Sequence, residues 1–525
     1  MPTEPYDYDL VGIGIGPFNL ALAALADPFP RLRTLFLDDK PAFSWHPGMM
    51  VPGARLQVPF LADLVSLVDP TSRYSYLAWL RNQGRLFEFY FSEQFHVPRI
   101  EYEAYCADVA ERLPSCRFDS QVTAVRPARL PDGRDGFAVT VAPPASPKRV
   151  DEQTGLTEQT RLTVLTANVV LGIGSEPSIP EALRGLCEEA ADLVCHNARY
   201  CDRAESIQAA DDITVLGSGQ SGAEVLLDLL RSWHRPGRRL RWLTGAAAIE
   251  PMEYSKLGLE HFTPDYTDLF HRLPEQRRDD LLAGQGRLYK AVSAETLAEI
   301  RNELDARSSP AGPAGTGVTI MPAVQAIGGR RDGGHVLLDL HHHETGQQIA
   351  VRTERLVLAT GYTQRTPHCL APLDELITLD LRGRPVVGRD FRVALSGSAA
   401  GLYLQNAELH SHGVGTPDLG LGAYRAATIL NAIARDGGAA VPCYRLPSRT
   451  AHTVFDPAVA AAADPGLVVA PGSAPGPVPG PASGSVPGPA RPAGPTSAIP
   501  QPGGRVGLPG PTRPQPAASR TGNRT

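Results

Sequence analysis

The stretch DLVGIGIGPFNLALAALA, residues 9–26, decides the fold of this chain. An apolar run leads into Gly12, Gly14 and Gly16, and a run of leucines and alanines follows. Gly12 and Gly14 hold the first two positions of the pattern GxGxxG, which allow a tight turn and a close approach of the backbone to a pyrophosphate. Pro17 holds the third position, where its fixed φ suits the first turn of a helix. The stretch therefore predicts a strand, a phosphate-binding turn and a helix.

The next apolar run, LRTLFLDD, supports this prediction. It ends at Asp38, at about the spacing at which dinucleotide-binding domains carry an acid for the ribose hydroxyls. The start of the predicted helix also turns free backbone amides and the positive end of its dipole toward phosphates. Strand, turn, helix, strand and acid come in the order of a dinucleotide-binding domain. We expect the ADP half of FAD at this site, bound by Gly12, Gly14, Gly16, Pro17 and Asp38.

A second glycine turn lies in DDITVLGSGQSGAEVLLDLL, between an apolar strand and an amphipathic helix. Its residues are Gly217, Ser218, Gly219, Gln220, Ser221 and Gly222. No acid closes the next strand, RRLRWLTG, and Arg238, Arg239 and Arg241 are nearby, which suits the 2′-phosphate of NADPH better than a free 2′-hydroxyl. Two dinucleotide sites in one chain indicate a flavoenzyme that passes hydride from nicotinamide to flavin.

Composition limits the remaining classes of protein. The chain has 525 residues and a formal net charge of -6 without a polybasic block, so its charge favours neither nucleic acid nor an anionic membrane as a partner. Its longest apolar runs are far shorter than the roughly 20 residues that span a bilayer. The start, MPTEPYDYD, lacks an apolar signal core. We expect a cytoplasmic protein without nucleic-acid or membrane partners, and we expect it to form a homo-oligomer.

Two groups of reactive side chains could suggest a catalytic or metal site. His341, His342 and His343 lie in VLLDLHHHETGQQIAV, a pattern typical of a β-hairpin with a Thr-Gly turn, and we assign no metal site to them. A flavin disulfide reductase needs a close cysteine pair on the first helix, whereas Cys195 and Cys201 lie far downstream. A flavin monooxygenase needs neither a metal nor a protein nucleophile, because reduced flavin itself activates oxygen. We therefore assign the chemistry to the flavin and to no catalytic side chain.

A longer segment allows a comparison with a known family. FSWHPGMMVPGARLQVPFLADLVSLVDPTSRYSYLAWL, residues 43–80, together with GIGIGPFNLALA and LVLATGYTQRTP, resembles the L-lysine/L-ornithine N-hydroxylase family of siderophore pathways. The resemblance covers about residues 8–434, and LQVPFLADLV resembles the lysine and diamine branch. It implies an FAD- and NADPH-dependent monooxygenase. In such an enzyme a C4a-hydroperoxyflavin transfers one oxygen atom of O2 to an unprotonated primary amine, and the product is a hydroxylamine.

The resemblance also implies site residues. Further cofactor contacts are implied at Trp45, His46, Met49, Gln57, Ala359, Thr360, Gly361, Tyr362 and Leu419. HNARY, residues 196–200, resembles the linker between the two glycine turns of flavin monooxygenases. Near the end, HSHGVGTPDLGLGAYRAATIL resembles the returning helix of the FAD domain, whose start meets the isoalloxazine ring. Gly420 stands there in place of the serine that relatives usually have.

Substrate choice is where the chain departs from its ornithine-specific relatives. Those relatives use one lysine and two asparagines to hold the α-carboxylate and α-amine, and the matching positions here are Ala62, Leu259 and Tyr289. A buried carboxylate without a partner costs several kcal/mol. A diamine such as cadaverine or putrescine fits best, and free L-lysine is the main rival. Two different functions stay open at this point: a flavin monooxygenase that acts on sulfur or a ketone, and a flavin-binding redox sensor without turnover.

The predicted architecture is α/β, with two Rossmann-like dinucleotide-binding domains. We expect an FAD domain from residues 1–205 and 351–455, and an NADPH domain over residues 206–350. The NADPH domain contains a small, mostly helical substrate segment at about residues 250–304. Residues 456–525 are rich in proline and glycine and poor in large apolar side chains, and they predict a disordered tail.

Overall fold

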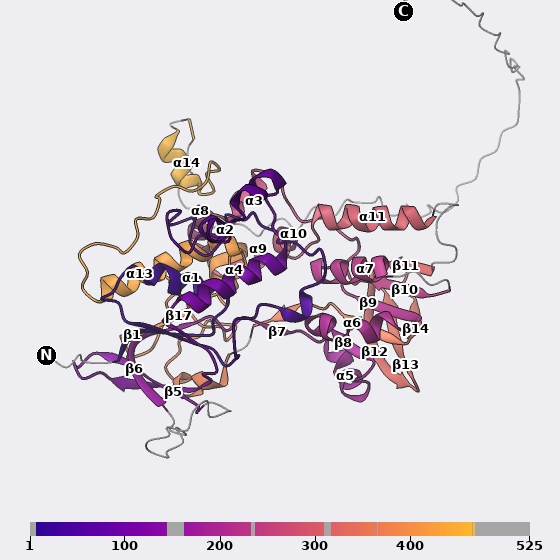
Figure 1. Cartoon of the computed structure of the whole chain (residues 1–525), viewed down its shortest axis with the longest axis horizontal. Coiled ribbons are helices and arrows are strands. Elements are labelled where there is room, and N and C mark those ends of the chain that lie inside the picture. Colours follow the sequence, from indigo (N-terminus) through magenta and orange to yellow (C-terminus); the bar gives the residue numbers. More distant parts are fainter. Residues whose placement is uncertain are drawn as a thin grey trace, which may run out of the picture. The chain divides into compact units, whose positions relative to one another are not determined.

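The computed structural model describes residues 7–143, 162–232, 237–308, 317–364, 366–464 and 466–467 (Figure 1). Within these ranges the chain is an α/β protein with two main sheets, as its sequence predicts. A short helix, α14 (Pro457–Ala463), lies where the tail was expected to begin, and Asp456 before it forms an ion pair with Arg272 (2.7 Å). The rest of the predicted tail, residues 468–525, lies outside the described residues.

The first sheet joins residues from both ends of the folded region. Its strands are β1 (Tyr8–Ile13), β2 (Thr34–Leu37), β3 (Cys116–Arg117), β4 (Val122–Arg129), β5 (Asp135–Val141), β6 (Leu162–Leu171) and β17 (Gly401–Leu404). The order is β3-β2-β1-β6-β5-β4, and β17 also pairs with β6. β1 runs parallel to both β2 and β6, whereas β4, β5 and β6 are antiparallel. The glycine turn after β1 therefore lies at the carboxyl edge of the parallel strands, where nucleotides bind.

Helices cover this sheet and bury its core. α1 (Pro17–Ala26) packs against α13 (Gly422–Asp436) and α4 (Arg99–Arg112) (Figure 1). Nine of the ten residues of α1 are buried, which explains why its sequence is apolar on every face. Two shorter helices, α2 (Tyr76–Asn82) and α3 (Leu86–Ser92), lie at and after the end of the segment that resembles the N-hydroxylases.

The second sheet is entirely parallel. Its strands are β8 (Val194–His196), β9 (Asp212–Leu216), β10 (Arg239–Leu243), β11 (Gly317–Met321) and β15 (Arg355–Leu358), in the order β11-β10-β9-β15-β8. The helices α5 (Arg184–Glu189), α6 (Tyr200–Gln208) and α7 (Gln220–Ser232) accompany it. β8 and β15 lie outside the range 206–350 that the sequence suggested for this domain. A glycine turn marks the strand before it, but it carries no information about which distant strands complete the sheet.

A smaller antiparallel sheet contains β12 (Val324–Asp332), β13 (His335–His342) and β14 (Gln348–Thr353). β13 and β14 pair across a turn in which Gly346 has a φ of +69°. The predicted hairpin around His341–His343 is therefore confirmed. The structure contains no cluster of three or more metal-ligating side chains within the ranges it describes.

Two features connect the sheets. β7 (Glu176–Pro177) pairs with β16 (Tyr362–Thr363), so the two crossings of the chain run side by side. The segment predicted to bind the substrate is mostly helical, and it consists of η4 (Gly258–Phe262), α8 (Pro264–Arg272), α9 (Glu275–Gly284), α10 (Gly286–Tyr289) and α11 (Ala294–Ser308). α11 packs against α7 of the second sheet. The substrate segment thereby lies beside the helix that starts at the second glycine turn.

Candidate active site

The first glycine turn is held in shape by the protein itself. Gly14 has a φ of +86°, and a Cβ there would lie 2.6 Å from the carbonyl oxygen of Gly172. A Cβ on Gly12 would lie 2.2 Å from the ring of Phe36. Gly16, which precedes Pro17 at the start of α1, has more room, because its Cβ would lie 3.8 Å from the nearest atom. The fold therefore requires Gly12 and Gly14, whereas Gly16 is open.

Asn19 supports the turn and was not recognised in the sequence. It is fully buried on α1, and its Nδ2 donates to the carbonyls of Ile13 (3.1 Å) and Gly14 (2.7 Å). Its Oδ1 accepts a hydrogen bond from Nε2 of Gln405 at the end of β17 (2.7 Å). Asn19 thus ties the turn to a strand almost 400 residues away in the chain. A polar residue inside an otherwise apolar helix was the available signal.

Asp38 also contacts the turn. One carboxylate oxygen accepts the N–H of Ile15 (2.7 Å) and the other accepts the N–H of Lys40 (3.0 Å). The side chain is 6% exposed and lies at the end of β2, as predicted. In this structure the acid anchors the glycine turn, and its contact with a ribose remains a prediction.

Three segments that the sequence treated separately meet in space. The WHPGM segment contains η1 (Pro47–Met49), and the HNARY segment contains η3 (Asn197–Arg199). A Cβ on Gly48 would lie 1.9 Å from the carbonyl oxygen of Ala198, so the two backbones touch. His46 before η1 has a φ of +51°. Burial, with the nearby charges of Arg99 and Lys40, lowers the pKa of His46 to about 4, so the imidazole is neutral at pH 7.

Tyr362 of the ATGY segment completes this group. Its hydroxyl accepts a hydrogen bond from Nδ2 of Asn197 (3.0 Å), and its ring lies 5.9 Å from that of His46 and 5.3 Å from that of His196. Nδ1 of His196 accepts the N–H of Ala198 (3.1 Å), so the proton resides on Nε2, which donates to the carbonyl of Gly361 (3.1 Å). His46, His196 and Tyr362 therefore form one aromatic cluster at the junction.

The second glycine turn contacts the other end of the ATGY segment. Gly217 has a φ of +137°, and a Cβ there would lie 2.0 Å from the carbonyl oxygen of Ala359. A Cβ on Gly222 would lie 2.5 Å from the carbonyl oxygen of Gly217. Thr360 donates to the carbonyl of Ser178 (2.6 Å). The remaining turn residues, Ser218, Gly219 and Ser221, are half-buried at the carboxyl edge of the sheet.

The arginines proposed for the 2′-phosphate lie at the wrong edge of this sheet. Arg239 and Arg241 are at the start and middle of β10, and both form ion pairs with Asp212 at the start of β9. Arg238 is 5% exposed and bonds to Asp211 (3.0 Å) and the carbonyl of Gln208 (2.6 Å). The glycine turn follows the other end of β9. The assignment of these arginines to the 2′-phosphate is therefore wrong, because their side chains pair with the aspartates that begin the neighbouring strand.

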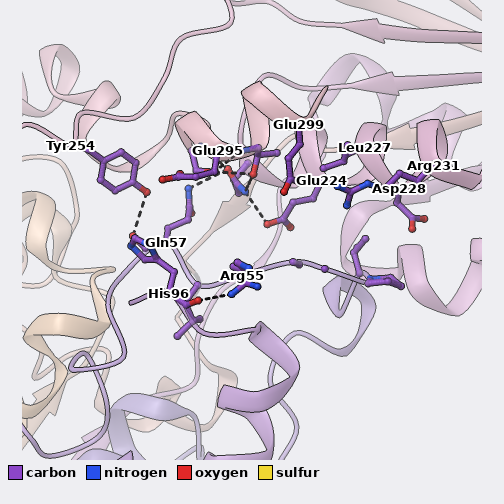
Figure 2. A pocket seen from close by; sticks show the side chains of 18 residues that line it. Arg55, Gln57, His96, Glu224, Leu227, Asp228, Arg231, Tyr254, Glu295 and Glu299 are labelled. Atoms are coloured by element: carbon purple, nitrogen blue, oxygen red, sulfur yellow. Dashed lines mark hydrogen bonds and ion pairs between the residues drawn. The ribbon is translucent and has the colours of Figure 1, made fainter. Parts of the chain in front are cut away.

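A polar network joins the flavin side to the NADPH side (Figure 2). Gln57 donates to Oε1 of Gln220 (3.2 Å), and Tyr254 donates to the carbonyl of Gln57 (3.3 Å). Oε1 of Gln220 also accepts the N–H of Ser293 (2.8 Å), and its Nε2 donates to Glu224 (3.0 Å). These residues line a cleft that opens to solvent. Gln57 and Gln220, assigned to different cofactors from the sequence, are thus in direct contact.

The three predicted substrate residues lie near, or on elements that pack against, one loop, residues 413–421, which contains η6 (Gly413–Gly415) and η7 (Leu419–Leu421). Ala62 is 5% exposed, and a Cβ on Gly420 would lie 3.9 Å from its methyl group. Leu259 lies on η4, which packs against η6. Tyr289 is half-buried against the apolar cluster that includes Val414. Leu419, predicted to contact the cofactor, packs against the core of the first sheet.

Arg425 fixes this loop. It is 2% exposed, and its guanidinium donates to the carbonyl of Thr416 (2.6 Å) and pairs with Glu408 (3.2 Å). The same guanidinium lies 4.6 Å from the ring centre of Phe18, directly after Pro17. Arg425 therefore connects the loop at residues 413–421 to the helix start at the first glycine turn. The sequence contained an arginine in an apolar helix as the only sign of this role.

Two nucleotide turns, one at the carboxyl edge of each main sheet, define the class of the protein as a flavin- and nicotinamide-dependent oxidoreductase. The family model for L-lysine 6-monooxygenase/L-ornithine 5-monooxygenase matches residues 6–364. The chain belongs to this family, so the resemblance seen in its sequence is confirmed, and it is a monooxygenase. No helix in the described ranges has the length and apolar character needed to cross a membrane.

Individual relatives agree with this assignment. The rhizobactin siderophore biosynthesis protein RhbE of Rhizobium meliloti is 39% identical over 81% of this chain and 91% of its own. A putrescine N-hydroxylase of Shewanella oneidensis is 39% identical over 81% of this chain and 80% of its own. The FAD-bound structure of DfoA, the cadaverine monooxygenase of the desferrioxamine pathway of Erwinia amylovora, is 36% identical and has a TM-score of 0.77, over 86% of this chain and 98% of its own.

A more distant structure shows the second cofactor. The ornithine N-hydroxylase KtzI of Kutzneria sp. 744, with reduced FAD, NADP+ and L-ornithine, is 26% identical and has a TM-score of 0.72. The alignment covers 82% of this chain and 99% of KtzI. The common fold therefore accommodates a flavin, a nicotinamide dinucleotide and an amine in one relative.

Proposed function

We propose that this protein hydroxylates one terminal amine of a short aliphatic diamine, putrescine or cadaverine. It prefers the diamine to L-lysine, and it prefers the diamine to L-ornithine by a much larger factor. The amine, O2, NADPH and a proton give a hydroxylamine, water and NADP+. The reaction fits a place in siderophore biosynthesis, as the names of RhbE and DfoA indicate for those proteins. Membership of the family establishes the class of reaction, and the part that we propose is the choice of substrate.

The observation that carries this proposal is the surroundings of Ala62. Its methyl group is buried against the loop at residues 413–421, where ornithine-specific relatives would have a lysine. Leu259, on the element that packs against the same loop, is apolar where those relatives have an asparagine. An α-carboxylate placed here would lose its hydration without gaining either partner, at a cost of several kcal/mol. A diamine carries no carboxylate.

The similarity of relatives supports the same choice. The proteins named for putrescine and cadaverine are 39% and 36% identical to this chain. The ornithine N-hydroxylase is 26% identical over a similar share of the chain. Similarity alone does not assign a substrate, and it agrees here with the residues at positions 62 and 259.

The residues present fit the two proposed cofactors. The turn of Gly12, Gly14 and Gly16 at the start of α1 suits the pyrophosphate of FAD, and the turn of Gly217–Gly222 suits that of NADPH. Bound FAD supplies the oxygen-transfer chemistry, and NADPH supplies the hydride. The protein holds the junction between them through the contacts of Gln57 with Gln220 and of Asn197 with Tyr362. The neutral His46 and His196 add no charge there.

The reacting amine must be unprotonated. A free primary amine has a pKa of about 10.4, as in lysine. The chain can favour the neutral form by removing that amine from water at the junction, which disfavours the charged state.

We also propose that the enzyme acts in the cytoplasm as a homo-oligomer. Light scattering of the purified protein tests the oligomeric state directly.

The experiment is hydroxylamine formation by the purified holoenzyme with NADPH, measured for putrescine, cadaverine, L-lysine and L-ornithine beside NADPH oxidation. Hydroxylamine from the diamines supports the proposal. A sulfide or ketone product without hydroxylamine supports a different monooxygenase, and NADPH oxidation without any product supports a redox sensor. The double variant Ala62→Lys with Leu259→Asn should shift activity from diamines toward amino acids, and an unchanged preference contradicts the role assigned to these two positions.

A further inference from the structure

The loop at residues 413–421 carries a carboxylate that has no assigned role in the proposed reaction. Asp418 precedes η7 and is half-buried. Its Oδ1 accepts the N–H of Gly420 (2.7 Å). Its Oδ2 has no hydrogen-bond or ion-pair partner among the residues that the structure describes. A carboxylate in this position has the capacity to accept a further charged donor.

Asp418 lies near Ala62, one of the positions that distinguish this chain from ornithine-specific relatives. A Cβ on Gly420 would lie 3.1 Å from Oδ1 of Asp418 and 3.9 Å from the methyl group of Ala62. The carboxylate and the methyl group therefore face the same point, and glycine leaves that point free of a side chain. Lysine is absent at position 62, and an anion lies close by. The local charge thus suits an ammonium group and not a carboxylate.

The charges around Asp418 do not neutralise it. Arg425 is a nearby cation, but its guanidinium already forms an ion pair with Glu408 and donates a hydrogen bond to the carbonyl of Thr416. The hydroxyl of Tyr254 donates to the carbonyl of Gln57, and burial, with the charges of Glu295 and Asp418, raises the pKa of Tyr254 to about 12. Burial raises the pKa of Asp418 itself to about 6, despite the Gly420 N–H and Arg425. A cation bound here would favour the ionised form.

We propose that the Asp418 carboxylate binds the distal ammonium of the diamine substrate and so determines specificity at this site. This inference rests on the proposed diamine N-hydroxylase activity. One amine of the substrate must be neutral to react, while the other keeps its charge and needs a counterion when it leaves water. L-Lysine would add a carboxylate next to that of Asp418.

The test compares diamines with monoamines of the same length. Wild type, Asp418→Asn and Asp418→Glu holoenzymes are assayed for hydroxylamine formation with cadaverine and with n-pentylamine. Asparagine keeps the shape and can still accept the N–H of Gly420, so it removes the charge with little change to the loop. The ratio of kcat/KM for cadaverine to that for n-pentylamine should fall about ten- to hundredfold in Asp418→Asn, through KM, as expected for a lost charged hydrogen bond. Asp418→Glu should restore part of the ratio.

A matched control is Glu295→Gln, because Glu295 is an exposed carboxylate that lines the cleft and, like Asp418, contributes to the raised pKa of Tyr254. Its ratio should stay within about twofold of wild type, because screened charges at a distance contribute little. An equal fall in Glu295→Gln would show a general field effect and overturn the role of Asp418. Flavin content and melting temperature of each variant establish that the loop is folded.

The failures of the two proposals are distinguishable. If wild type prefers L-lysine or L-ornithine to cadaverine, the proposed substrate class fails. If wild type prefers cadaverine and Asp418→Asn keeps the ratio, the inference about Asp418 is wrong while the diamine activity stands. If Asp418→Asn does not retain flavin, Ala62→Lys provides the second test, because its ammonium would pair with Asp418 and lower the same ratio. An unchanged ratio in Ala62→Lys then overturns the inference.

Discussion

Arg99 and Glu224 form a two-pronged ion pair, with nitrogen–oxygen distances of 2.9 and 2.7 Å, between α4 beside the first sheet and α7 of the second. Their side chains are 13% and 5% exposed. Arg99 also donates to the carbonyl of Met49 in the WHPGM segment (2.8 Å), and Glu224 accepts a hydrogen bond from Gln220 of the second glycine turn. One buried pair therefore fixes the flavin-side loop relative to the nicotinamide-side helix.

Removing one partner of this pair should destabilise the protein. Glu224→Gln leaves the Arg99 charge buried without its counterion, and the free energy of unfolding should fall by roughly 3 kcal/mol or more. Glu299→Gln breaks the exposed pair of Glu299 with Arg231 and should cost less than about 1 kcal/mol. Urea unfolding of both variants measures the difference. Similar losses in the two variants would contradict the stabilising role of the buried pair.

Substitutions at Gly14 and Gly16 distinguish the structural role of the first glycine turn from its role in nucleotide binding. Gly14→Ala should lower both flavin content and stability, because φ is positive and the Cβ meets the carbonyl of Gly172. Gly16→Ala should leave the melting temperature of the flavin-free protein nearly unchanged, since its Cβ has 3.8 Å of room. If the pyrophosphate approaches this turn, Gly16→Ala should still reduce flavin content, measured by absorbance. Full flavin content in both variants would refute the assignment of the turn.

The placement of the arginines changes the prediction for cofactor preference. NADPH should still reduce the flavin faster than NADH at low concentration. Arg241→Gln, however, should lower stability without changing that preference, because Arg241 pairs with Asp212 at the edge of the sheet away from the glycine turn. Stopped-flow reduction with both nicotinamides measures the preference. If Arg241→Gln selectively slowed flavin reduction by NADPH, Arg241 would have to contact the nucleotide.

Buried histidines should make the protein sensitive to acid. His412 is 2% exposed and stacks on Phe391 (4.3 Å), and burial, with Arg389 and His271 nearby, holds its pKa well below 6.5. The unfolded chain binds more protons than the folded one between that lowered pKa and 6.5, so stability is lost as the pH falls below about 6.5. Melting temperatures from about pH 7.5 to about pH 5.5 should fall less steeply in His412→Gln than in wild type.

The comparison with wild type is needed because other groups titrate in the same range. His271 and His410 also have lowered pKa values and act in the same direction. Burial raises the pKa values of Asp418 and Glu408, which act in the opposite direction. Parallel pH profiles for His412→Gln and wild type would contradict the role of His412.

The sequence predicted what depends on local pattern. Glycine spacing after an apolar strand placed both nucleotide turns, and alternating residues around a Thr-Gly turn predicted the histidine hairpin, because these features are determined by neighbouring residues. The arginines were misplaced for the same reason: closeness to β10 in sequence does not say at which end of a sheet a side chain lies. Asn19, Arg425 and Asp418 were missed because their partners lie in segments that only the fold brings together.

The central claim is the preference for a diamine, and its most direct measurement is kcat/KM for hydroxylamine formation with cadaverine, putrescine and L-lysine at subsaturating concentrations. Because Ala62 is buried beside the loop at residues 413–421, we expect kcat/KM for at least one diamine to exceed that for L-lysine by about tenfold or more. A factor of that size corresponds to one charged hydrogen bond. An advantage of about tenfold for L-lysine would contradict this claim and would require a partner for the α-carboxylate near position 62.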